Sequence, residues 1–271
     1  MSETSQAMYD ERPDVTRDST WLGAHPDHAA RYLYAAQFVK GRSVLDAGTG
    51  PGYGAAILRE AGALYVQAVD VDEPTIVEAA ARYPIPRIEF MVDDCEKLEK
   101  VRGPIDVICS FENIEHLRCP ENFLRAATRI LSPSGTLLVS SPDRGGACPQ
   151  WIDGKPANPY HFIEWYRDEF RSLLSKYFQK VELRTQAVSY AAIVRRQATD
   201  NLREHLKYLW TTPLVRFSRT VGRVMGRSYP WPNIEGFSAN SVHDYPILSE
   251  SAVKAVGEAV SHYAICTDPR G

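Results

Sequence analysis

Residues 43–54 read SVLDAGTGPGYG, the stretch around which the other segments of the chain are arranged. Two apolar residues, Val44 and Leu45, lead into Asp46, and glycines follow at every second position from Gly48. A helix-like run, AAILREAGA, comes next. A strand, a glycine turn and a helix N-terminus recur where nucleotide-type ligands bind, because glycine permits positive φ angles and close approach of the backbone. The stretch therefore predicts such a ligand, and the following strand ends must identify it.

The composition is that of an ordinary globular protein. The chain has 271 residues, 44% of them hydrophobic and 24% charged, with a net charge of −3. This length fits one large domain or one domain with an insertion, and the small net charge gives no global attraction to nucleic acid or anionic membrane. Five scattered cysteines without a CxxC pair argue against a disulfide framework or a thiolate zinc site. No apolar run approaches a membrane span and no signal-peptide pattern is present, so we expect a cytoplasmic protein.

Strand-like and helix-like segments alternate on both sides of the glycine turn. This rhythm predicts an α/β, Rossmann-like fold: a seven-stranded, mostly parallel sheet with helices on both faces. The strands are expected at 43–46, 64–72, 87–94, 105–110, 136–141, 180–186 and 262–268, and the helices at 26–39, 75–83, 121–131 and 168–178.

Three segments complete the predicted organisation. Residues 1–24 are polar and of mixed charge and predict a flexible N-terminal arm, while residues 25–271 form the domain itself. Residues 188–258, between the last two strands, show no strand rhythm and predict a helical insertion or lid. Within it, the segment 195–231 is basic and rich in aromatic residues. It is either a solvated helical cap or a lid that meets an anionic acceptor.

Acids stand at the next strand ends, which is where ligands bind in an open α/β sheet. Asp70, 24 residues after Asp46, is placed to accept both hydroxyls of a ribose, or it is a solvated loop acid or helix cap. Asp94, followed by Cys95, is placed to accept from an adenine amino group, or it lies in a surface turn. Position alone leaves these alternatives open.

Together, five stretches resemble the successive motifs of class I S-adenosylmethionine-dependent methyltransferases. They lie in order over residues 43–142 and read DAGTGPGYG, AVDVDE, VDDCEKL, IDVICSFENIEHL and ILSPSGTLLVSSP. A dinucleotide-binding Rossmann enzyme would share the glycine turn and the acid after it, but not the DDCEKL and FENIEHL stretches. The resemblance implies that the cofactor is S-adenosylmethionine.

The resemblance also implies the residues that bind this cofactor. The glycines would let the backbone approach the methionine part, Asp70 would hold the ribose and Asp94 would meet the adenine amine. Arg31 is a candidate for the cofactor carboxylate, or else a surface arginine of the first helix. The full implied set is Arg31, Asp46, Gly48, Gly50, Gly52, Asp70, Val71, Asp94, Cys95, Ser110 and Phe111.

The stretch FENIEHL, residues 111–117, carries the chemistry. Glu112, Glu115 and His116 are spaced i, i+3, i+4, so one helical turn would point all three the same way. Converging carboxylates repel unless a proton or cation lies between them, and adding an imidazole suits a divalent metal, with Mg²⁺ or Mn²⁺ expected. The alternative is that the Glu-His pair only caps a helix or places a base near the methyl group.

A later histidine, His161 in YHFIEWYRDEF, extends this set. The pairing resembles the metal-dependent small-RNA 2′-O-methyltransferases, and ubiquinone-biosynthesis O-methyltransferases share part of the turn. The first resemblance implies that Glu112, Glu115, His116 and His161 are metal ligands and that the last three are catalytic. Ile163, ahead of Glu164 and Trp165, departs from that pattern.

The acceptor is predicted from a further resemblance. HAARY at 28–32 and NPYHFIEWYRDEF at 158–170 resemble bacterial methyltransferases that accompany glycan and polysaccharide assembly. We therefore expect O-methyl transfer to a sugar, nucleotide-sugar or glycan, assisted by a divalent metal. The alternatives are RNA ribose 2′-O-methylation, which the charge of −3 and the lack of an RNA-binding module disfavour, methylation of a catechol- or quinone-type small molecule, and a non-catalytic cofactor-binding scaffold.

Overall fold

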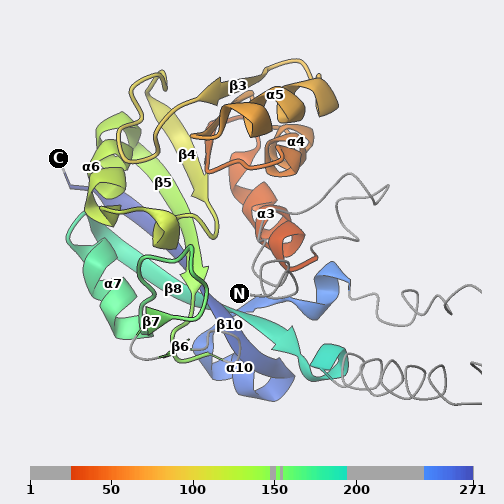
Figure 1. Cartoon of the computed structure of the whole chain (residues 1–271), viewed down its shortest axis with the longest axis vertical. Helices are drawn as coiled ribbons and strands as arrows, with labels where there is room; N and C mark the ends of the chain where they lie inside the picture. The colour runs from red at the N-terminus through yellow and green to blue at the C-terminus, as the bar shows by residue number, and fades with distance from the viewer. Residues whose placement is uncertain (1–25, 147–150, 153–154, 194–240, 271) are drawn as a thin grey trace, which may run out of the picture.

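The computed structural model describes residues 26–146, 151–152, 155–193 and 241–270. It contains an eight-stranded sheet in the order β3-β2-β1-β4-β5-β10-β8-β9, with helices packed on it (Figure 1). The predicted arm, residues 1–24, and the whole basic segment, residues 195–231, lie outside the described residues. The strands of this sheet are β1 (Ser43–Ala47), β2 (Tyr65–Asp70), β3 (Ile88–Val92), β4 (Ile105–Ser110), β5 (Leu131–Pro142), β8 (Phe178–Ser189), β9 (Ile247–Leu248) and β10 (Gly257–Pro269).

The predicted Rossmann-like architecture is confirmed, but the predicted strand number is wrong. The first five strands pair in parallel, whereas β10 runs antiparallel between β5 and β8. The additional strand is β9, which comes from the segment expected to be a helical insertion and pairs antiparallel with β8. Its two residues are too short to give a pattern in the sequence, yet they pair with part of the outer edge of β8. A small hairpin, β6 (Trp151–Ile152) with β7 (Lys155–Pro156), forms a separate sheet.

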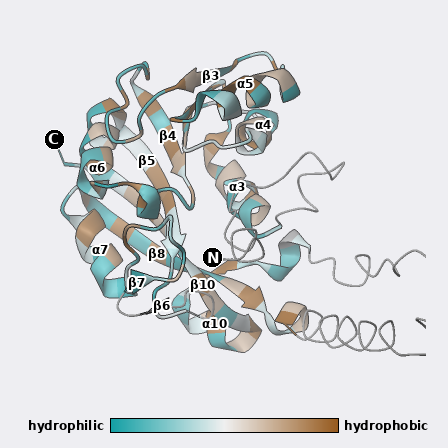
Figure 2. Cartoon of the chain, in the orientation of Figure 1, coloured by the Kyte–Doolittle hydropathy of each residue, from teal (hydrophilic) through white to brown (hydrophobic). Residues whose placement is uncertain are grey.

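The helices begin and end where local sequence signals favour it. Asp72 caps α5 by accepting from the Thr75 backbone N–H, and prolines stand at the start of α5 and α6. Most helices carry hydrophilic and hydrophobic residues along the same ribbon, as expected when one side packs on the sheet (Figure 2). The helices are α3 (Pro26–Val39), α4 (Tyr53–Glu60), α5 (Glu73–Arg82), α6 (Pro120–Ile130), α7 (Arg167–Ser175) and α10 (Glu250–Val256), with short 3₁₀ turns η1 (Ile114–His116) and η3 (Val242–Asp244).

The sheet is buried on both faces. Val44 and Val107 belong to a hydrophobic cluster with α3 and α4, whereas their neighbours Leu45 and Ile108 belong to another with α6 and α7. Successive side chains along each strand point to opposite faces of the sheet and therefore pack into two different hydrophobic clusters. This is why these strands are apolar throughout. The parallel strands all end at the same edge, where the candidate site lies. Among the described residues, no helix combines the length and apolar character needed to cross a membrane.

Candidate active site

The glycine turn borders open space at one position. Gly48, Gly50 and Gly52 all have positive φ angles, of 78°, 51° and 84°. A Cβ at Gly48 would come 2.5 Å from Asn113 Cγ, and one at Gly52 would come 2.8 Å from Ala79 and Phe90. A Cβ at Gly50 would meet no atom of the described residues within 4 Å. Two of the glycines thus allow close packing of the protein itself, and only Gly50 leaves room for a ligand.

Asp46 joins the leading helix to this turn. Its buried carboxylate accepts hydrogen bonds from the Tyr32 hydroxyl at 2.9 Å and the Thr49 hydroxyl at 2.7 Å. Burial raises the pKa of Asp46 to about 6, although both hydrogen bonds oppose that rise. The Tyr32 ring also lies against Gly54, where an added Cβ would come 2.1 Å from it. Helix α3 is therefore held against the glycine turn.

Asp70 meets the turn at the end of β2. One carboxylate oxygen accepts from the Gly50 N–H at 3.0 Å, and the other accepts from the Asp72 N–H at 3.0 Å. Val71, next in sequence, is largely exposed. Of the turn glycines Gly48, Gly50 and Gly52, the structure thus brings Asp70 to the one beside which no described residue lies within 4 Å of an added Cβ, as a ribose-binding acid would require.

Asp94 and Cys95 lie in the turn after β3. The Asp94 carboxylate accepts from the Glu96 N–H and forms an ion pair with Lys97 at 3.3 Å. Cys95 is buried, and burial raises the pKa of its thiol to about 12, so it acts as a small apolar side chain.

Asn113, which follows β4, contacts the glycine turn, and the sequence did not predict this contact. Its side-chain amide donates to the Ser110 hydroxyl at 3.0 Å, and its side chain covers Gly48. Phe111 points into the core beneath α3, with its ring centroid 5.0 Å from that of Tyr32. Asn113 links the glycine turn to the turn after β4. The one sequence signal for this contact is that Asn113 lies within FENIEHL.

Arg31 is a buried arginine, only 2% exposed. One guanidinium nitrogen lies 3.4 Å from Glu112 Oε2 and donates to Ser261 Oγ at 3.3 Å. Its Nε and Nη1 have no hydrogen-bond partner among the described residues. Because a buried, unpaired guanidinium N–H is costly, these donors fit an incoming carboxylate, such as that of an amino-acid-like cofactor.

The structure does not bring Glu112 into the predicted metal set. The 3₁₀ turn η1 covers only Ile114–His116, and Glu112 precedes it in a left-handed conformation with φ of 48°. Ser140 Oγ donates to the Glu112 carboxylate at 2.8 Å and accepts from the Glu112 N–H at 3.1 Å. The single helical turn needed for i, i+3, i+4 convergence therefore does not form, and Glu112 becomes the counter-ion of Arg31 instead.

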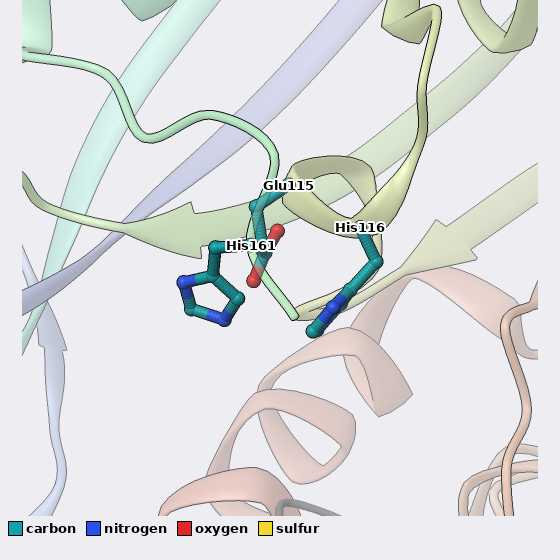
Figure 3. Close-up of side chains that lie close together, drawn as sticks. All are labelled: Glu115, His116 and His161. Carbon is teal, nitrogen blue, oxygen red and sulfur yellow. The ribbon is translucent and has the colours of Figure 1, made fainter. Parts of the chain in front are cut away.

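The other three predicted residues do converge. Ligand atoms of Glu115, His116 and His161 all lie within 4.8 Å of one another, and the three side chains approach each other from two different segments (Figure 3). The two imidazole centroids are 4.8 Å apart, with the rings nearly perpendicular. These three residues are hereafter the Glu-His-His cluster.

Glu115 is the most unusual group in the cluster. It is fully buried, and neither carboxylate oxygen has a hydrogen-bond partner among the described residues. Burial raises the pKa of Glu115 to about 8, and nearby Glu112 adds to the rise, while His116 and His161 oppose it. A buried carboxyl group without partners is destabilising unless a proton or cation neutralises it.

Both imidazoles are held by partners that fix their orientation. His116 Nδ1 lies 3.1 Å from the Tyr160 carbonyl oxygen, and His161 Nδ1 lies 2.6 Å from Glu164 Oε1. Since these oxygens accept, each Nδ1 carries the proton, and in His161 the other ring nitrogen, Nε2, accepts from the Asn158 amide nitrogen Nδ2 at 3.0 Å. Glu164 and Asn158 are site residues that the sequence prediction missed. A metal held by the cluster would take the two Nε2 atoms as ligands, and at His161 it would replace the hydrogen bond from Asn158.

A protein-family model described as "Methyltransferase domain" matches residues 25–189, a range that includes the glycine turn, Asp70 and the Glu-His-His cluster. The chain belongs to this methyltransferase family. The predicted class I S-adenosylmethionine-dependent methyltransferase domain is therefore confirmed.

Curated relatives match this chain over only part of their own length. A Mycobacterium tuberculosis (strain ATCC 25618 / H37Rv) protein named "Probable S-adenosylmethionine-dependent methyltransferase" is 36% identical over 162 residues, which is 60% of this chain and 56% of that protein. A "Ubiquinone biosynthesis O-methyltransferase" of Coxiella burnetii is 28% identical over 117 residues, or 42% of this chain and 49% of that one. The methyltransferase thus spans little more than half of the mycobacterial relative it matches.

Solved structures share the fold of this methyltransferase. The [4+2]-cyclase SpnF superposes with a TM-score of 0.57 at 17% identity, covering 93% of this chain and 85% of that one. Phosphoethanolamine N-methyltransferase 2 of Haemonchus contortus superposes with a TM-score of 0.56 at 15% identity, covering 89% and 53%. At this level of identity the likeness shows the fold, and the chemistry must be argued from the site.

Proposed function

We propose that this protein transfers the methyl group of S-adenosylmethionine to a hydroxyl of a sugar, nucleotide-sugar or glycan, assisted by a divalent metal held by the Glu-His-His cluster. The observation that supports the metal is Glu115, a buried carboxylate that has no hydrogen-bond partner in the described part of the chain and lies beside two oriented imidazoles. Three protein ligands leave coordination positions open for the acceptor. With two imidazoles in the set, Mn²⁺ suits the site better than Mg²⁺.

The cofactor would bind along the edge formed by the glycine turn. Gly50 would allow its close approach and Asp70 would accept its ribose hydroxyls. Arg31 Nε and Nη1, which have no partner within the described ranges, would donate to its carboxylate. S-adenosylmethionine supplies a methyl group on a sulfonium, which an oxygen nucleophile attacks directly. The role of this chain is then to align donor and acceptor and to remove the proton of the acceptor hydroxyl.

A sugar hydroxyl is a weak nucleophile because its pKa is high. A bound divalent ion supplies the charge that lowers this pKa and orients the oxygen. Glu164 and the Tyr160 carbonyl accept from the Nδ1 atoms of the two imidazoles, so the Nε2 atoms are the nitrogens that would bind the ion. Without a metal, Glu115 would be the proton acceptor, since a carboxylate with a pKa of about 8 is suited to general-base work near neutral pH.

The acceptor class is tested by label transfer. Radiolabelled S-adenosylmethionine is offered with neutral and charged sugars, a catechol and short RNAs, with Mn²⁺ and with EDTA. We expect label in a sugar product, lost in EDTA and restored by excess Mn²⁺. Label only in the catechol, the alternative that the ubiquinone-pathway relative favours, or only in RNA would overturn the sugar acceptor. Undiminished transfer in EDTA would overturn the metal.

Glu164 provides a prediction about the metal. Its carboxylate binds His161 at 2.6 Å, and both side chains are at most 5% exposed. Glu164→Gln keeps an acceptor but loses the charge, so we expect the Kd for Mn²⁺ to rise about 10-fold, and Glu164→Ala to raise it up to about 100-fold. Calorimetric titration of the cofactor-free protein measures this. Glu169→Gln is the control, because Glu169 accepts from the Tyr166 N–H on the outside of α7. Unchanged Mn²⁺ affinity in Glu164→Ala would contradict the assignment.

A further inference from the structure

Four large apolar side chains are exposed together beside the Glu-His-His cluster. Tyr160, Phe162, Ile163 and Tyr166 are between 37% and 54% exposed, and they are hereafter the aromatic rim. Eleven large hydrophobic residues are exposed in the described part of the chain, and these four fall within seven consecutive positions. Scattered exposed apolar residues are ordinary, but such a group beside a site indicates a binding surface.

The backbone of the aromatic rim is fixed to the candidate site. The Phe162 N–H donates to the Glu115 carbonyl at 2.9 Å, and the Tyr160 carbonyl faces His116. Trp165, within the same segment, is buried and accepts from the Arg144 N–H at 3.1 Å. The segment is therefore anchored by its backbone and its buried residues, and the exposed rings are not needed for the core.

Two arginines lie against the rings of the aromatic rim. The guanidinium carbon of Arg118 is 4.9 Å from the Phe162 ring centroid, and that of Arg144 is 4.7 Å from the Tyr166 centroid. Such pairs orient a ring while leaving N–H donors at its border. Among the described residues, no acidic side chain forms an ion pair with Arg118. A planar guanidinium in this setting matches the oxygens of a phosphate or carboxylate.

We infer that the aromatic rim, with Arg118 and Arg144, is the acceptor-binding surface, and that the acceptor is a sugar bearing an anionic group. The inference rests on the proposed function for the sugar itself. One face of a pyranose ring presents C–H groups, which pack on an aromatic face and bury apolar surface. The guanidinium groups beside the rings would then meet a phosphate or carboxylate on the same molecule, which positions a hydroxyl toward the Glu-His-His cluster.

Binding of small probes to the full chain tests this surface without methyl transfer. The probes are methyl glucoside, glucose 6-phosphate, glucuronic acid and inorganic phosphate, titrated with the cofactor product S-adenosylhomocysteine present and followed by ligand-observed NMR. We expect one of the anionic sugars to bind at least about 10-fold more tightly than both the neutral sugar and free phosphate, a difference equal to about 1.4 kcal/mol. The tighter of the two identifies phosphate or carboxylate as the anionic group.

Substitutions in the aromatic rim test whether this surface is responsible for binding the anionic sugar. Phe162→Ala and Arg118→Gln should each weaken binding of the anionic sugar by about 10-fold. Tyr65→Ala and Arg102→Gln are the controls, because both residues are exposed at the opposite edge of the sheet, and they should leave binding unchanged. All four sites are exposed, so melting temperatures should stay near that of the wild type.

Equal binding of neutral and anionic sugars, no binding of either, or unchanged binding in the rim variants would overturn the inference. Those results would leave the proposed function standing if label transfer to a sugar is still observed. Conversely, rim-dependent binding of an anionic sugar with transfer of label only to a catechol or RNA would overturn the proposed acceptor but not the binding surface.

Discussion

Glu115→Gln is expected to abolish methyl transfer and, at the same time, to stabilise the metal-free protein. The substitution removes the single carboxylate of the Glu-His-His cluster, and the turnover number should fall by about a thousandfold, the equivalent of several kcal/mol of lost charge stabilisation. Cofactor affinity should remain near that of the wild type, because Glu115 is not among the groups around Gly50 and Asp70.

The gain in stability has a definite pH dependence. Burial raises the pKa of Glu115 from 4.5 to about 8, so the folded metal-free protein binds a proton that the unfolded chain lacks between these pH values. The free energy of unfolding of the wild type therefore falls as pH rises from about 4.5 to 8, and Glu115→Gln lacks that loss. At pH 7 the variant should be more stable by roughly 3 kcal/mol, and near pH 4 the two should be equal.

Chemical denaturation in EDTA across this pH range measures the effect. Added Mn²⁺ should then stabilise the wild type but not Glu115→Gln. Glu112→Gln is the matched comparison: it leaves the buried Arg31 without its nearest counter-charge, so it should destabilise the protein while Mn²⁺ binding persists. A Glu115→Gln protein that is less stable than the wild type at pH 7, or that keeps full activity, would contradict the account.

Gly50→Ala is expected to abolish cofactor binding in a protein that still folds. An added Cβ at Gly50 meets no atom within 4 Å in the part of the chain that the structure describes, so the expected cost to folding is that of the positive φ of 51°, about 1 kcal/mol. The methyl group would occupy the space through which the cofactor approaches, and the Kd for S-adenosylhomocysteine should rise by about 100-fold or more.

Gly54→Ala is the matched comparison for Gly50→Ala. Its Cβ would come 2.1 Å from the Tyr32 ring, so this variant should lose several kcal/mol of stability. Calorimetric titration and thermal melts of both variants provide the measurement. Near-normal cofactor affinity in Gly50→Ala would mean that the open space at Gly50 is not where the cofactor lies.

Sequence patterns predicted the parts of the fold that local chemistry determines. A few consecutive residues are enough to predict the glycine turn, the apolar strand at 105–110 and the acid that ends β2. The strand β9 did not, because its two residues pair with β8 through contacts from a distant segment. The same holds for Glu112, whose left-handed conformation is tied to Ser140 on the neighbouring strand, so spacing alone did not reveal that its carboxylate pairs with Arg31.

In the candidate site too, the sequence predicted some residues and not the contacts that hold them. Glu115, His116 and His161 were predicted from residue type and from resemblance, and the structure brings them together. Their supporting contacts, such as the Tyr160 carbonyl on His116, depend on the path of the loop before α7. No residue type signals a backbone carbonyl as a partner, which is why this layer of the site appears only in the structure.

The central claim is that Glu115, His116 and His161 bind one divalent metal. The most direct measurement is a crystal structure of the protein with S-adenosylhomocysteine and Mn²⁺, inspected for anomalous scattering from manganese. We expect one peak about 2.0–2.3 Å from a Glu115 oxygen and the Nε2 atoms of both histidines, with Glu112 still bound to Arg31. No peak among these three side chains at saturating Mn²⁺, or a peak coordinated by Glu112, would contradict it.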